Sequence, residues 1–99
     1  FPALYQNKFD ETEHQSLAIS YLIDQKKWGK ATARFFESDL AAQTSIYDYI
    51  FRKLADSGKI EAARIVSEHL LEKMLQSQKI TGHEYGDEIA IVQYYLSLL

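Results

Sequence analysis

The chain has 99 residues, of which 46% are apolar and 25% are charged, and its formal net charge is −3. This length allows one domain with one modest core, and the apolar content argues against disorder. Nucleic-acid binders usually carry a basic stripe, so the mild acidic balance argues against a nucleic-acid partner.

Residue types that are rare or absent exclude further classes of protein and of binding site. The chain has no cysteine, which excludes disulfides and thiolate metal sites and is compatible with the cytoplasm. No apolar run approaches the roughly 20 residues that a membrane-spanning helix needs. Because the chain opens at Phe1 rather than Met, we expect a processed protein or a piece of a longer one.

The first predicted helix begins at an N-cap, Asp10, with Glu13 three residues later as in a capping box, and ends near Gln25. Its apolar residues cover more than half of its circumference and leave Ser20 and Asp24 as the polar strip. A face this wide needs cover from two sides. We expect the irregular segment 1–10 to pack on this helix through its apolar side chains: Phe1, Leu4, Tyr5 and Phe9.

Two helices are predicted in the middle of the chain. One runs from about Trp28 to Ala42 and carries two neighbouring apolar stripes, which indicates contact with helices on both sides. The next is capped by Thr44 or Ser45, has Asp48 in its first turn, and ends at Gly58. Its buried face follows the i, i+3, i+4, i+7 pattern: Tyr47, Ile50, Phe51 and Leu54.

A fourth helix is predicted from about Lys59 to Gln76, and a fifth from about Glu84 to the end of the chain. From Ile89 onward only Gln93 and Ser97 are polar. The β-branched residues in this run would also suit a strand, but no other segment resembles a strand partner, so we predict a helix. A helix that is apolar nearly all round should be buried nearly all round.

Two parts of the chain align with each other when the sequence is shifted so that Lys27 falls on Lys59. The same shift places Trp28-x-x-Ala31 on Ile60-x-x-Ala63. A period in the low thirties is typical of stacked helical hairpins. The sequence therefore predicts an all-α domain over residues 1–99, either a five-helix antiparallel hairpin stack or an irregular helical bundle with the same helices.

The stretch from Tyr47 to Glu68 resembles one hairpin of the tetratricopeptide or pentatricopeptide repeat families. Both families place a glycine in the turn, then an apolar residue, then an alanine, as Gly58, Ile60 and Ala63 do here. The earlier copy departs from this pattern at Lys26, and no proline closes either unit. The tetratricopeptide resemblance implies peptide or protein binding in a concave groove, and the pentatricopeptide resemblance implies single-stranded RNA.

No motif nominates catalytic, cofactor-binding or metal-binding residues, and we predict that the chain is not an enzyme. Glu11 and His14 have the Glu-x-x-His spacing of di-iron bundles, but the chain has no second copy of that motif. His69 is predicted to be a surface residue because it points away from the apolar face of its helix. His83 with Asp87 is best explained by local helix capping.

The fifth helix is the predicted site of action. We expect part of its surface to form an interface with a protein partner or a second copy of the chain: Tyr94, Tyr95, Leu98 and Leu99. Tyr49 falls opposite a buried face and is a second, exposed candidate. The predicted function is a non-enzymatic protein–protein interaction module, such as an adaptor, an assembly subunit or a partner-neutralising protein. The alternative is a nucleic-acid-associated helical protein that uses a basic cluster around the first turn: Lys26, Lys27, Lys30 and Arg34.

Overall fold

The computed structural model describes residues 8–99, with side chains described from Glu13 onward. Within that range the chain forms five helices and no strand: α2 (Lys8–Asp24), α3 (Trp28–Glu37), α4 (Leu40–Asp56), α5 (Ile60–Thr81) and α6 (Gly86–Ser97). The predicted all-α fold is confirmed, and so is the helix in the apolar C-terminal run. The predicted cover from Phe1, Leu4, Tyr5 and Phe9 lies outside the described side chains.

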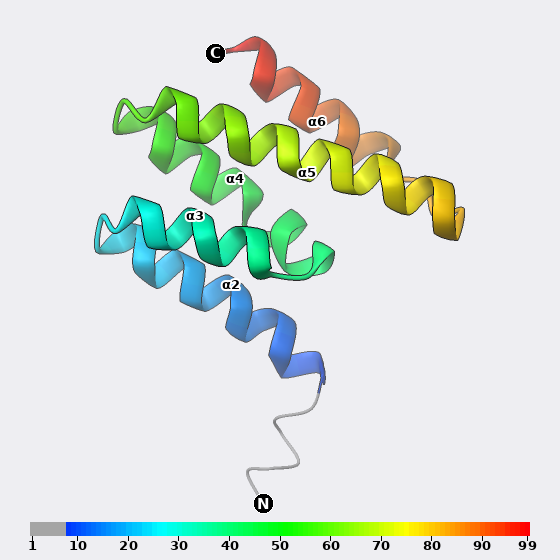
Figure 1. Cartoon of the computed structure of the whole chain (residues 1–99), viewed down its shortest axis with the longest axis horizontal. Coiled ribbons are helices and arrows are strands. Elements are labelled where there is room, and N and C mark those ends of the chain that lie inside the picture. Colours follow the sequence, from blue (N-terminus) through cyan, green and yellow to red (C-terminus); the bar gives the residue numbers. More distant parts are fainter. Residues whose placement is uncertain (1–7) are drawn as a thin grey trace, which may run out of the picture.

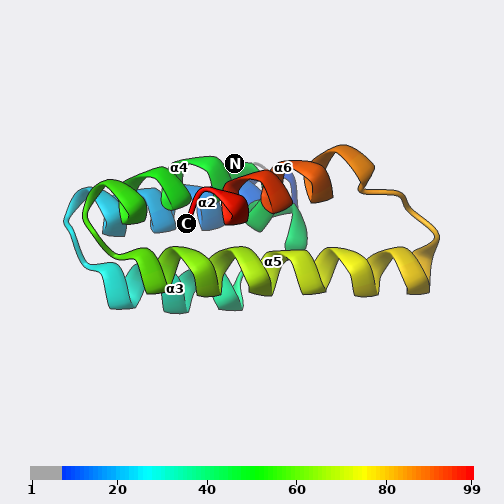
Figure 2. The same ribbon diagram turned by 90° about the horizontal axis from the view of Figure 1, so that it is seen from above.

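The five helices form two layers. Successive helices run antiparallel and lie side by side (Figure 1), and a view turned by 90° places α2, α4 and α6 in one layer and α3 and α5 in the other (Figure 2). The result is a slab of 46 by 37 by 17 Å. α4 packs against both α2 and α5, whereas α6 packs mainly against α5. α6 is therefore the end helix of the stack (Figure 1).

The two turns that close the hairpins α2–α3 and α4–α5 have the same geometry. The Lys27 N–H donates to the carbonyl of Leu22 over 2.9 Å, and in the second hairpin the Lys59 N–H donates to the carbonyl of Leu54 over 2.8 Å. The residue before each lysine has a positive φ, 60° at Lys26 and 78° at Gly58. In the first turn a lysine thus occupies a left-handed position that suits glycine.

The break between α3 and α4 lies at Ser38 and Asp39, so the predicted second helix to Ala42 is too long and the predicted caps Thr44 and Ser45 are wrong. Asp39 is the N-cap, and its carboxylate accepts a hydrogen bond from the backbone N–H of Ala42 over 2.9 Å. Asp48 is consequently in the middle of α4 rather than in its first turn.

A buried glutamine stabilises this break. The Gln43 amide, which is completely buried, donates to the carbonyl of Phe35 over 2.6 Å and to that of Ser38 over 3.2 Å. These carbonyls lie at the end of α3, and that of Phe35 also accepts the Ser38 N–H over 3.2 Å. A polar residue in the core therefore donates hydrogen bonds to backbone carbonyls at the break between α3 and α4.

The other helix ends also differ from the predicted ones by a few residues. α2 begins at Lys8, so Asp10 is inside the helix and is not its N-cap. α5 continues past the predicted end at Gln76 to Thr81, and Gly82 then ends it with a φ of 77°. None of the helices described between residues 8 and 99 combines the length and hydropathy that a bilayer crossing requires.

The core lies between the two layers. All four residues predicted for the buried face of α4 are buried, from Tyr47 at 4% exposure to Leu54 at 0%. On α2, Leu17 and Tyr21 are 63% and 61% exposed. Across the layers the buried apolar side chains form one cluster: Ile19, Ile23, Ala31, Phe35, Ile46, Tyr47, Ile50, Phe51, Leu54, Ala63, Val66, Leu70, Met74 and Val92.

Candidate functional site

α6 has a large exposed apolar surface. Val92 is its one fully buried residue, so the described helices do not bury α6 all round, and the interface expected to cover the rest stays a prediction. Ile91, Tyr94 and Leu98 are 49%, 60% and 60% exposed. Their spacing of i, i+3 and i+7 places them on one face of the helix, and we call this face the α6 stripe. The predicted interface residues Tyr94 and Leu98 belong to it.

The other two predicted interface residues face the protein itself. Tyr95 and Leu99 are half-buried and pack against the core cluster. The Tyr95 ring stacks on Phe51 with centroids 4.7 Å apart and an angle of 15° between the planes, and its centroid is 5.7 Å from that of Tyr47. Tyr95, one of the aromatic residues expected to reach a partner, therefore fastens α6 to α4.

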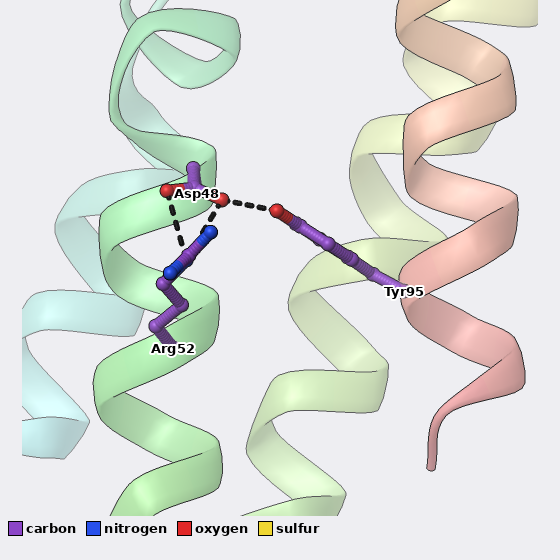
Figure 3. A network of polar contacts seen from close by, with 3 residues as sticks. All are labelled: Asp48, Arg52 and Tyr95. Atoms are coloured by element: carbon purple, nitrogen blue, oxygen red, sulfur yellow. Dashed lines mark hydrogen bonds and ion pairs between the residues drawn. The ribbon is translucent and has the colours of Figure 1, made fainter.

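The hydroxyl group of Tyr95 adds a polar contact to this anchor. It donates to the carboxylate of Asp48 on α4, which also pairs with Arg52 over 3.0 Å (Figure 3). The hydrogen bond from Tyr95 is the main reason why the pKa of Asp48 lies below its ordinary value, and Arg52 lowers it further. Asp48 thus stays ionised on the surface between α4 and α6.

A groove of about 270 Å³ runs between α4 and α6, above α5. We call it the α4–α6 groove. Its lining is mainly apolar, with two carboxylates and no basic side chain: Thr44, Tyr47, Asp48, Leu70, Glu88, Ile91, Val92 and Tyr95. Ile91 belongs to both the groove and the α6 stripe. The groove and the stripe therefore form one continuous surface. Two of its residues, Glu88 and Val92, were not predicted from the sequence.

The wall that α4 contributes to the groove is rigidly held. The Tyr47 hydroxyl and the Ser67 hydroxyl are 2.6 Å apart, and Ser67, which is completely buried, donates to the carbonyl of Ala63 over 2.8 Å. Burial raises the pKa of Tyr47 to about 12, so the phenol is neutral at physiological pH. Tyr47 presents a fixed, uncharged ring to the groove.

Tyr49, the second predicted interface residue, contacts α2 instead of extending freely into solvent. It is half-buried, and its hydroxyl donates to the carboxylate of Asp24. That carboxylate raises the pKa of Tyr49. The Lys53 ammonium lies 5.5 Å from the ring centroid, within cation–π range. Tyr49 therefore joins α4 to α2 on the opposite side from the groove-forming helix α6.

The predicted basic cluster is exposed. Lys26 and Lys27 lie in the α2–α3 turn, and Lys30 and Arg34 lie on the surface of α3. The positions 26, 30 and 34 follow one another at steps of four residues. Trp28, the aromatic residue beside these cations in the sequence, is half-buried and packs against the core.

His69 is not the surface residue that its place on the helix predicts. It is half-buried on α5, and its ring lies 4.6 Å from that of Phe36 on α3, centroid to centroid. Its Nε2 is buried and has no hydrogen-bond partner among the described residues. Burial, followed by the nearby charge of Lys73, lowers the pKa of His69.

The other acidic residues and histidines do not gather into a metal centre in the described part of the chain. Between residues 13 and 99, no three side chains of the ligating types lie close enough together to hold an ion, and the side chain of Glu11 lies outside the described ones. The His83 ring packs edge-on against Tyr85, and the His83 N–H donates to the Thr81 hydroxyl at the end of α5. These contacts hold the loop between α5 and α6.

Comparison with protein-family models, with curated proteins and with solved structures found no match to this chain.

Proposed function

We propose that this chain is a non-enzymatic protein–protein interaction module that acts through α6. The observation that carries the proposal is the α6 stripe, in which Ile91, Tyr94 and Leu98 are each about half exposed or more on one helical face. An i, i+3, i+7 series of apolar side chains is the usual pattern by which a helix packs against another protein. Burying such a stripe would contribute favourable free energy to binding.

The position of α6 in the stack supports this proposal. α6 packs mainly on α5, and no helix between residues 8 and 99 covers its other side. End units of helical stacks normally expose a polar face to stay soluble. An apolar face in that position is expected where another protein, or a second copy of the chain, adds the next element.

We also propose that the chain is built from helical hairpin repeats of the tetratricopeptide type. The matching turns at Lys26–Lys27 and Gly58–Lys59 support this proposal, because the same hydrogen bond closes both of them. Ala31 and Ala63, which occupy equivalent positions in the two hairpins, are both completely buried, as helices that pack closely require. A repeat of this type would make a partner protein the expected ligand.

The proposal is tested by removing apolar side chains of the α6 stripe and, as a control, a matched pair of apolar side chains on α2. Tyr94→Ser/Leu98→Ser removes a tyrosine and a leucine four residues apart on α6, and Leu17→Ser/Tyr21→Ser removes the same residue types at the same spacing on α2. Light scattering measures the solution mass of both variants and of the wild type over a range of concentrations. We expect the wild type to self-associate, the α6 variant to be a folded monomer, and the α2 variant to behave as the wild type does.

If all three proteins are folded monomers, the α6 stripe is not a homodimer interface. The proposal then requires a heterologous partner that the wild type and the α2 variant bind and the α6 variant does not. Equal binding by all three proteins would contradict it. Circular dichroism shows whether each variant has kept its helices.

Nucleic-acid binding through the basic cluster is the second candidate function. It is favoured by one observation, the exposed series Lys26, Lys30 and Arg34 along one side of α3 and its leading turn. The net charge of −3 and the packing of Trp28 against the core make it the weaker candidate. Oligonucleotide binding that falls steeply with salt would support it.

A further inference from the structure

The α4–α6 groove has an apolar floor and an acidic rim. Leu70 and Val92 line it and are each 1% exposed, so they lie at its bottom. Asp48 and Glu88 line it from α4 and α6 and are exposed, which places their carboxylates at its edges. A ligand that fits this arrangement buries an apolar group and keeps a positive charge near the surface.

Glu88 is the rim carboxylate that is open to a new partner. Asp48 already pairs with Arg52 over 3.0 Å and accepts the Tyr95 hydroxyl. Glu88 forms no ion pair with any residue between 13 and 99 that the structure describes. The helix dipole favours both Asp87 and Glu88 in the first turn of α6, but of these two only Glu88 lines the groove.

The wider charge distribution also favours a basic ligand. Residues 80–99 contain three acidic side chains, Glu84, Asp87 and Glu88, and no lysine or arginine. Because Arg52 offsets the charge of Asp48 on the α4 side, the unpaired negative charge of the groove lies at Glu88, where it attracts positively charged segments during association. The basic residues of the chain closest in sequence, such as Lys79, belong to the preceding helix.

The size of the groove indicates a side chain of a protein as the occupant. The groove has a volume of about 270 Å³. Pockets for drug-sized molecules and cofactors usually measure about 300–1,000 Å³ and enclose most of the ligand. A groove smaller than this range, continuous with the exposed α6 stripe, suits one or two side chains of a segment that also lies along α6.

We propose that the α4–α6 groove binds a segment of a partner protein that places one aliphatic or aromatic side chain on Leu70 and Val92 and an adjacent lysine or arginine on Glu88. This inference rests on the proposed interaction function and specifies the chemistry of the partner. The apolar side chain displaces water from the floor, and the basic residue selects the partner by its charge.

The test uses a phage-displayed library of random peptides, selected on the immobilised wild-type chain. We expect the enriched peptides to share an aliphatic or aromatic residue next to lysine or arginine. A synthetic peptide from that set should bind about tenfold more weakly to Glu88→Lys, and raised salt should narrow the difference by screening the charges. Glu37→Lys, the same charge reversal at an exposed position of α3, should bind as the wild type does.

Three outcomes would overturn the inference: no enriched peptide, enriched peptides without a basic residue, or equal binding to wild type and Glu88→Lys. They can be separated from a failure of the proposed function. If a peptide or partner is lost in Tyr94→Ser/Leu98→Ser but is unaffected by Glu88→Lys, the interaction module stands and the groove chemistry is wrong. If neither variant affects any binding, both proposals are wrong.

Discussion

The half-buried ring of His69, packed against Phe36 with a buried Nε2, makes the stability of the protein depend on pH. Because burial lowers the pKa of His69 in the folded state, the unfolded chain binds a proton first as pH falls. The free energy of unfolding should therefore be constant above the unfolded pKa of about 6.5 and should decrease as pH falls from there toward the folded pKa. Denaturant titrations at about pH 7.5 and 5.5 measure the difference.

The control for this prediction is His69→Gln, which cannot titrate and should remove most of the decrease between the two pH values. His83→Gln changes an exposed histidine and should leave the decrease in place. Asp48 does not interfere, because its lowered pKa makes a contribution that is lost only as pH falls below its unfolded value of about 3.9. An unchanged pH dependence in His69→Gln would show that another group is responsible.

At the scale of the elements, the two equivalent hairpin turns differ at one residue. Lys26 has a φ of 60° where Gly58 has a φ of 78°. A left-handed backbone costs an L-amino acid roughly 1–2 kcal/mol, and glycine loses about 0.5–1 kcal/mol more backbone entropy on folding. Lys26→Gly should therefore raise the free energy of unfolding by roughly 0.5–1 kcal/mol, as measured by denaturant titration.

The reverse substitution and a charge control complete this test. Gly58→Ala should lower the free energy of unfolding by about 1 kcal/mol. No atom beyond the two neighbouring residues lies within 4 Å of the position of the added Cβ, so the loss would come from the backbone conformation. Lys26→Ala removes the charge but keeps the left-handed conformation, and it should not reproduce the gain of Lys26→Gly. A gain of equal size would assign the effect to charge.

At the scale of the whole molecule, the layers predict an order of local stability. α4 lies between α2 and α5, whereas α6 packs mainly on α5 and has Val92 as its one fully buried residue. Hydrogen exchange should therefore be slowest in α4 and fastest, among the helices α4 to α6, in α6. Val92→Ala should weaken α6 by roughly 1–3 kcal/mol and accelerate its exchange while α4 stays protected.

Two further variants check this local effect. Ile91→Ala, at a neighbouring position that is 49% exposed, should change exchange in α6 much less than Val92→Ala. Val66→Ala makes the same substitution at a completely buried position of α5, which contacts three other helices, and should accelerate exchange in α4 as well as α6. Equal acceleration of all helices by Val92→Ala would mean that α6 unfolds only together with the core.

Much of the fold could be predicted because local patterns decide it. The i, i+3, i+4, i+7 series from Tyr47 to Leu54 predicted the buried face of α4 correctly, since the period of the α-helix places these side chains on one side. Gly58 predicted the end of α4 because few residues other than glycine adopt its positive φ at low cost. The break at Ser38 was missed, because it depends on Gln43 reaching back to the end of α3 in the folded core.

The sequence predicted which helix carries the candidate site, but not which of its side chains face outward. The excess of apolar residues in the last helix is a property of the sequence, and it identified α6 as a surface that its own fold would not cover. Which of those residues point outward depends on the rotation of α6 against α5, which tertiary packing decides. That packing turns Tyr95 onto Phe51, exposes Tyr94 and Leu98, and brings Asp48 and Glu88, which lie on different helices, to the two edges of one groove.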